Sequence, residues 1–145
     1  MTPSFNIIED YLEKPYWVID ILPKQVPDDS DGQYFKIERY FLDQPQRERV
    51  CCQFSSLLIK LNCYFNMKVS HSMDDWIVNP APETMESWVA EGQLLYVLME
   101  SQNAMIGFSG DDHYMTLYNP NERLLEIISA LASSEGLFVW KPEIR

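Results

Sequence analysis

The chain has 145 residues, with 22 Asp and Glu against 11 Lys and Arg, so its formal net charge at pH 7 is −11. Residues 69–122 contain no Lys or Arg and hold nine of the carboxylates. Because such a field repels phosphate backbones and anionic lipid, the charge argues against nucleic-acid and membrane-surface partners and favours basic proteins or cations. A hydrophobic content of 46% argues against a disordered chain.

The location is expected to be cytoplasmic. The longest uninterrupted apolar run covers residues 94–99, far short of the ~20 residues that span a bilayer. The N-terminal residues lack the features of a secretory signal. Three cysteines, two of them adjacent, do not suit a disulfide framework, and we expect all three to act as small, reduced, apolar residues.

The first half of the chain predicts three helices and one strand. A helix is expected over residues 5–14, with Ser4 as a possible N-cap. Residues 16–22 are apolar on both faces, which is typical of an inner strand. A short helix is indicated by the spacing of Tyr34, Ile37 and Phe41. The clearest long helix runs over about residues 45–62, where Phe54, Leu57, Leu58 and Leu61 form an apolar stripe.

The middle of the chain predicts mainly strands. Residues 64–71 alternate between apolar and polar side chains, as in a half-buried strand, and residues 75–79 suit a shorter one. A helix is expected over residues 83–91, ending at Gly92. Three strands joined by short turns follow, which requires an antiparallel meander. These three strands cover residues 94–100, 104–109 and 113–118.

The last helix is expected over residues 120–135. Asn119 suits the N-cap, Pro120 the first helical position and Glu122 the capping box. Gly136 is expected to end the helix in the left-handed conformation. Residues 137–140 then predict a short closing strand.

These elements predict an α+β fold in a single domain, residues 1–145. Its sheet is expected to be mainly antiparallel, built from the meander 94–118 and from strands near 16–22, 64–71 and 137–140. The helices near 45–62 and 120–135 carry the longest apolar stripes and are expected to cover the sheet. Leu58 and Ile128 should therefore be nearly fully buried.

Two short segments hold histidine beside aspartate, and they suggest a metal site as one alternative. His71 and Asp74 lie in the first segment, and Asp111, Asp112 and His113 lie in the second. Imidazole and carboxylate suit a divalent metal, and both segments flank predicted strands, so they could meet at one edge of the sheet. A metal-dependent enzyme is the function that this alternative implies. Asp is also common in turns because it hydrogen-bonds locally, and that interpretation stays open.

The leading functional hypothesis is a non-enzymatic protein-binding module that presents an acidic face to a basic partner. One concrete form is an inhibitor or immunity-type protein that blocks a basic toxin or nuclease. The expected contact residues are Asp74, Asp75, Trp76, Asp111 and Asp112. The glycines are scattered singly, so no phosphate-binding loop is indicated and no cofactor is expected. A homodimer is possible, because four Trp could exceed what one small core can hide.

Four phrases carry a resemblance to a known group of proteins. They cover residues 15–23 (PYWVIDILP), 61–64 (LNCY), 111–120 (DDHYMTLYNP) and 135–142 (EGLFVWKP). On these phrases the chain resembles an uncharacterised family of small acidic proteins from anaerobic gut bacteria. The resemblance implies a compact bacterial domain and no particular chemistry.

Overall fold

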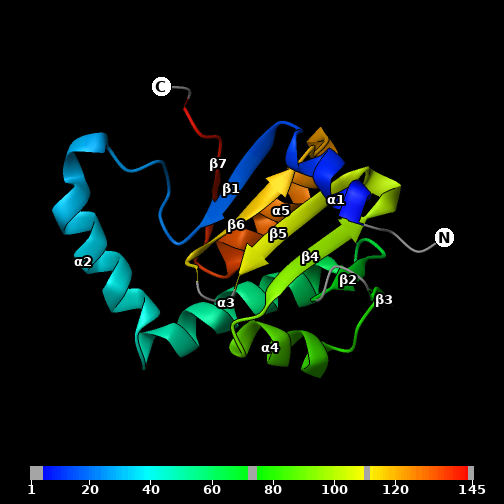
Figure 1. Ribbon diagram of the computed structural model, residues 1–145, viewed down its shortest axis with the longest axis horizontal. Coiled ribbons are helices and arrows are strands. Elements are labelled where there is room, and N and C mark those ends of the chain that lie inside the picture. The colour runs from blue at the N-terminus through cyan, green and yellow to red at the C-terminus, as the bar shows by residue number, and fades with distance from the viewer. Residues whose placement is uncertain (1–4, 72–74, 110–111, 144–145) are drawn as a thin grey trace.

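An antiparallel sheet forms the centre of the computed structural model, which describes residues 5–71, 75–109 and 112–143 (Figure 1). Its seven strands lie in the order β3-β2-β4-β5-β6-β1-β7. The strands are β1 (Tyr16–Asp20), β2 (Lys68–Ser70), β3 (Ile77–Val78), β4 (Leu94–Met99), β5 (Ala104–Ser109), β6 (Tyr114–Tyr118) and β7 (Phe138–Trp140). The helices are α1 (Phe5–Leu12), α2 (Asp31–Leu42), α3 (Gln46–Leu61), α4 (Pro82–Ala90) and α5 (Glu122–Ser134), and short 3₁₀ turns occupy Asp28–Ser30 and Glu100–Gln102. The α+β class, the meander and the inner position of β1 are confirmed.

Helices α3, α4 and α5 cover one face of the sheet and form the main core with it. The apolar stripe of α3 is buried, and Leu58 and Ile128 are both fully inaccessible, as predicted. Burial of such stripes against a sheet is the main source of helix stability in a domain of this size. Cys51 is buried on α3, whereas Cys52 and Cys63 are exposed, so the expectation that all three act as apolar residues was wrong.

Helix α1 lies on the opposite face of the sheet, over part of it (Figure 1). Ile8 is fully buried there and packs with Tyr96, Leu98 and Met105 of β4 and β5 in a second, smaller core. Further along the same face, β6, β1 and β7 expose aromatic side chains. These are Tyr16, Tyr114 and Phe138.

Helix α2 stands to one side of the sheet and meets the rest of the molecule mainly at the start of α3 (Figure 1). The helix was predicted, and two of the three residues that predicted it, Tyr34 and Phe41, lie on its half-buried inner side. The third, Ile37, is 49% exposed, which corrects the prediction. Glu38 takes the inward position instead, because Tyr34, Glu38 and Phe41 follow the i, i+4, i+7 spacing of one helix face.

Strand β2 is shorter than predicted because asparagine side chains replace part of the ladder. The alternating segment was expected to be extended from residue 64, but β2 begins at Lys68. The backbone N–H of Met67 donates to Oδ1 of Asn79, and Nδ2 of Asn62 donates to the same oxygen. These bonds satisfy backbone groups just before β2, as hydrogen bonds within a turn would. The alternation of apolar and polar side chains in the sequence gives no sign of such bonds.

The N-cap of α5 is Asn121, two residues later than predicted. The Asn121 Oδ1 accepts a hydrogen bond from the backbone N–H of Leu124 at 2.8 Å, and Glu122 begins the helix. Asn119 instead takes a left-handed conformation with a φ of 59° and donates to the carbonyl of Asn103. At the other end, Gly136 has a φ of 76°, which confirms it as the left-handed stop.

Candidate functional site

A buried polar cluster around His113 joins the sheet to α2. His113 immediately precedes β6, and the register of β6 with β1 places Asp20 opposite Tyr114, beside His113. The Nδ1 of His113 lies 3.0 Å from Oδ1 of Asp20. Its Nε2 lies 2.9 Å from Oε2 of Glu38 and 2.8 Å from the hydroxyl oxygen of Tyr34. Tyr34 and Glu38 are four residues apart, so they share one face of α2.

The geometry of the cluster favours the charged form of the imidazole. Each ring nitrogen of His113 faces a carboxylate, and an ionised carboxylate only accepts hydrogen bonds, so a ring that donates from both nitrogens suits both contacts. Burial alone would lower the pKa of His113, but the hydrogen bonds and charges of Asp20 and Glu38 together outweigh it and raise that pKa above its ordinary value. Burial, and then the charge of Glu38, raises the pKa of Tyr34 and keeps its hydroxyl protonated.

A small cavity of about 220 Å³ adjoins this cluster on the β6–β1–β7 side of the sheet. Val18, Tyr34, Tyr114 and Trp140 line it together with Asp20 and His113. The Nε1 of Trp140 is buried, and none of the described residues accepts its hydrogen bond.

The metal hypothesis required His71 and His113 to come together. Strands β2 and β6 do place both residues at the same edge of the sheet, as expected, but β4 and β5 lie between them. Three interstrand spacings amount to about 14 Å, too far for two ligands of one ion. His71 instead stacks on Trp88 of α4, with ring centroids 4.9 Å apart. Asp20 and Glu38 lie on opposite sides of the His113 ring and cannot coordinate one ion with it.

The remaining members of the metal hypothesis add no cluster among the described residues. Asp74 and Asp111 lie outside the described residues, and Asp112 is half-buried beside His113. Within residues 5–71, 75–109 and 112–143, no three His, Cys, Asp or Glu side chains are grouped so that they could hold a metal ion.

Of the residues predicted to contact a partner, the described ones, Asp75, Trp76 and Asp112, lie toward the same edge of the sheet, and Asp74 and Asp111 lie outside the described residues. Strands β2 and β5 end at this edge, and β4 and β6 begin there. Asp75, Glu91 and Asp112 flank these strand ends, and we call the three carboxylates the acidic edge. Asp75 and Glu91 are exposed. Trp76 is half-buried against the smaller core under α1, so it is less accessible than a free-standing interface anchor would be.

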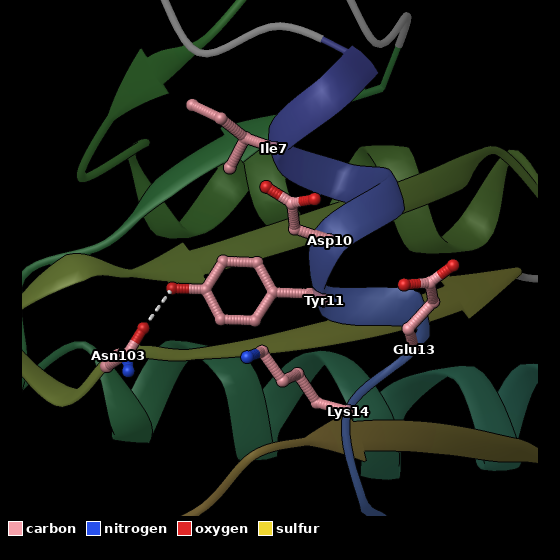
Figure 2. Close-up of a pocket in the computed structure, with 6 residues that line it drawn as sticks. All are labelled: Ile7, Asp10, Tyr11, Glu13, Lys14 and Asn103. Carbon is pink, nitrogen blue, oxygen red and sulfur yellow. Dashed lines mark hydrogen bonds between the residues drawn. The ribbon is translucent and has the colours of Figure 1, made fainter.

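A larger surface hollow lies elsewhere, beside α1, and holds about 510 Å³ (Figure 2). The Tyr11 hydroxyl crosses it to donate to Oδ1 of Asn103 at 2.8 Å. Asp10 on α1, and Glu13 and Lys14 just after its end, border the hollow with two carboxylates and an ammonium group (Figure 2). The described side chains here contain neither a histidine nor a nucleophile beside a base, so this hollow offers no recognisable catalytic set.

Three members of the His113 cluster were missed from the sequence: Asp20, Tyr34 and Glu38. One signal was present, because Asp20 is a carboxylate within an otherwise apolar inner strand, and a buried carboxylate requires a partner. The partner of Asp20 is set by the β1–β6 register and by the orientation of α2. Neither can be read from the local pattern of apolar and polar residues.

Comparisons with known proteins add nothing to this geometry. No protein-family model matches the chain, and neither the curated proteins nor the solved structures include a significant match. Among the described residues, no helix has both the length and the apolar content that crossing a bilayer requires.

Proposed function

We propose that the protein is a non-enzymatic binding module that presents its acidic edge to a basic protein, as an inhibitor or immunity-type protein would. The observation that supports this most directly is the placement of Asp75, Glu91 and Asp112 along the same ends of four neighbouring strands. The sequence around them contains no Lys or Arg from residue 69 to residue 122. The edge therefore presents carboxylates whose field is not cancelled within their own segment.

Hydrogen bonds hold the carboxylate of Glu91 and the backbone of Asp112 in place, which suits recognition. The side chain of Glu91 accepts hydrogen bonds from Ser87 at 3.0 Å and from Gln93 at 2.7 Å, and the backbone N–H of Asp112 donates to the carbonyl of Ser109 at 2.9 Å. Groups that are held in place lose less conformational freedom when a partner binds. A complementary field also raises association rates by ~10–10³, and salt reduces this gain.

A pull-down with matched charge variants tests the proposal. Asp75→Lys/Glu91→Lys reverses two charges at the acidic edge. Asp10→Lys/Glu13→Lys, the α1 variant, reverses two exposed charges on and just after α1 and changes the net charge by the same amount. Both variants should melt cooperatively, which confirms that each is folded.

The wild-type protein and the α1 variant should retain the same basic protein at about 0.01 M ionic strength, with less retained at about 0.15 M because the Debye length shortens from roughly 30 to 8 Å. The acidic-edge variant should retain little of it at either ionic strength. Equal retention by all three proteins, or no basic protein retained at low salt, would exclude this function.

A further inference from the structure

The cavity of about 220 Å³ on the β6–β1–β7 side is built on one face of the sheet. Val18 and Asp20 alternate along β1 and share this face, whereas Ile19 between them belongs to the main core on the other face. Tyr114 of β6 pairs directly with Asp20. Trp140 of β7 pairs directly with Val18, and side chains that pair directly lie on the same face. The register of three neighbouring strands therefore brings these four lining residues together.

Segments outside the sheet complete the lining of the cavity. Gln25 and Val26 come from the loop after β1, and Tyr34 comes from α2. The hydroxyl of Tyr34 lies 2.8 Å from Nε2 of His113, which holds the tyrosine ring at the cavity. A preformed cavity with apolar walls and a few convergent polar groups is the usual form of a small-molecule site.

The charged groups around the cavity favour a cation. A charged His113 between Asp20 and Glu38 leaves these three groups with one net negative charge. Two tyrosines that line the cavity respond to this field. Burial, and then the charges of Glu38 and Asp20, raise the pKa of Tyr34. Burial, and then neighbouring carboxylates that include Glu38 and Asp20, raise the pKa of Tyr114. A field of this sign attracts a cationic ligand and repels an anionic one.

The hydrogen-bonding groups of the cavity distinguish one kind of cation from another. A primary ammonium brings three donors that each require an acceptor. Oδ1 of Asp20 already lies 3.0 Å from Nδ1 of His113, and Oε1 of Gln25 accepts from the backbone N–H of Glu143 at 2.6 Å. A quaternary ammonium needs no acceptor, and aromatic rings attract it. Three of the lining residues supply such rings, so the cavity suits the quaternary cation better.

Trp140 adds a requirement for an oxygen atom in the ligand. Its Nε1 is buried and meets no acceptor within the described part of the chain. An indole N–H only donates, and a buried donor without an acceptor destabilises the structure. The volume of about 220 Å³ corresponds to about seven water molecules in the liquid, so an organic molecule of roughly seven non-hydrogen atoms fills it.

We propose that this cavity binds a small, free quaternary ammonium compound that carries an oxygen acceptor, the chemical class to which choline belongs. The aromatic rings and the carboxylates of the cluster hold the cation, and Trp140 donates a hydrogen bond to the oxygen. This inference does not rest on the proposed function, because a small-molecule site does not require that a basic protein binds the acidic edge.

NMR titration of the isotope-labelled full chain with choline chloride, at constant ionic strength, tests the site. The chain has four Trp, and Trp140→Phe identifies the indole N–H signal of Trp140. Choline should shift this signal saturably. The neutral alcohol in which carbon replaces the nitrogen of choline has the same shape and should bind about tenfold more weakly. Tetramethylammonium, which has the charge but no oxygen, should bind and shift the Trp140 signal much less.

Variants locate the binding. Tyr114→Leu removes one aromatic ring and should weaken choline binding about 2- to 30-fold. Glu38→Gln removes one carboxylate and should also weaken binding. Tyr64→Leu is the matched control, because Tyr64 is 58% exposed and does not line the cavity, so this variant should bind choline as the wild-type protein does. Cooperative melting of each variant confirms that it is folded.

Four outcomes would overturn the proposal. The first is the absence of a saturable shift with choline, which is the result expected if water alone fills the cavity. The second is equal binding of choline and its neutral analogue, and the third is unchanged binding in both Tyr114→Leu and Glu38→Gln. The fourth is co-sedimentation with phosphatidylcholine vesicles, which present the same cation on a lipid headgroup and would replace the free molecule as the ligand.

Discussion

The imidazole of His113 lies 3.0 Å from the carboxylate of Asp20, and both side chains are at least 95% inaccessible to solvent. This pair connects the end of β1 to the start of β6 inside the sheet. The opposite nitrogen of the ring reaches Glu38, so one buried histidine fixes the position of α2 relative to the sheet. The outer surface of α2 is presented to solvent as a consequence.

The first prediction concerns the proton on His113. Because Asp20 and Glu38 raise its pKa above the ordinary value of about 6.5, the ring should titrate above that pH in an NMR experiment. Glu38→Gln removes one of the two carboxylates and should move the midpoint down. His71→Gln assigns the signals, because the chain holds only two histidines. An unchanged midpoint in Glu38→Gln would show that Glu38 does not stabilise the charged ring.

The same pKa makes the stability depend on pH. A raised pKa means that the folded state binds the proton more tightly than the unfolded chain does. The stabilisation is fully present below about pH 6.5 and is lost as the pH rises through the pKa of the folded state. Urea unfolding from pH 6 upward should therefore show a steeper loss of the free energy of unfolding in the wild-type protein than in Glu38→Gln. Parallel curves would contradict this linkage.

A third prediction tests the main core. Leu58→Ala and Ile128→Ala should each lower the free energy of unfolding by ~2–5 kcal/mol, because each leaves a cavity in addition to losing buried apolar area. Leu12→Ala is the control, since Leu12 is 42% exposed and should change the free energy of unfolding much less. Chemical denaturation of the three variants provides the comparison, and equal losses in all three would argue against the packing described.

Sequence periodicity was sufficient for the elements that bury a continuous stripe and insufficient for contacts between distant segments. The stripes that contain Leu58 and Ile128 could be read directly, because burial repeats with the helical period. Asp20 and His113 are 93 residues apart, and their contact depends on strand order, which periodicity does not encode. The inward position expected for Ile37 on α2 was wrong for a related reason. The inner side of α2 holds Glu38, and a carboxylate faces inward only because a distant histidine receives it.

The fourth prediction separates the two asparagines that compete as the cap of α5. Asn121→Ala should cost about 1 kcal/mol, because Oδ1 of Asn121 accepts from the N–H of Leu124. Asn119→Gly keeps the left-handed conformation available and loses only the side-chain bond to the Asn103 carbonyl, so its cost should be smaller. Thermal melts of the two variants compare these two losses of stability. A larger loss of stability in Asn119→Gly would show that Asn119, not Asn121, caps the helix.

The last prediction compares Gly136, whose backbone is left-handed, with Gly32, which lies in α2. Gly136 has a φ of 76°, where a side chain costs about 1–2 kcal/mol, and an added Cβ would lie 3.1 Å from Nε2 of Gln53. That nitrogen donates to the carbonyl of Glu135, so displacing it also weakens a bond at the end of α5. Gly136→Ala should therefore destabilise the protein, and Gly136→Val should do so further because a β-branched residue resists this conformation.

Gly32 is the matched control. It lies in α2, and an added Cβ there meets nothing within 4 Å, so Gly32→Ala should raise the free energy of unfolding by about 0.5–1 kcal/mol through the lower entropy of the unfolded chain. The opposite signs of the two alanine substitutions follow from the backbone conformation and the surroundings of each glycine, since both add the same methyl group. Destabilisation by Gly32→Ala would show that the start of α2 is not helical in solution, and a neutral Gly136→Ala would show that α5 does not end in the left-handed turn.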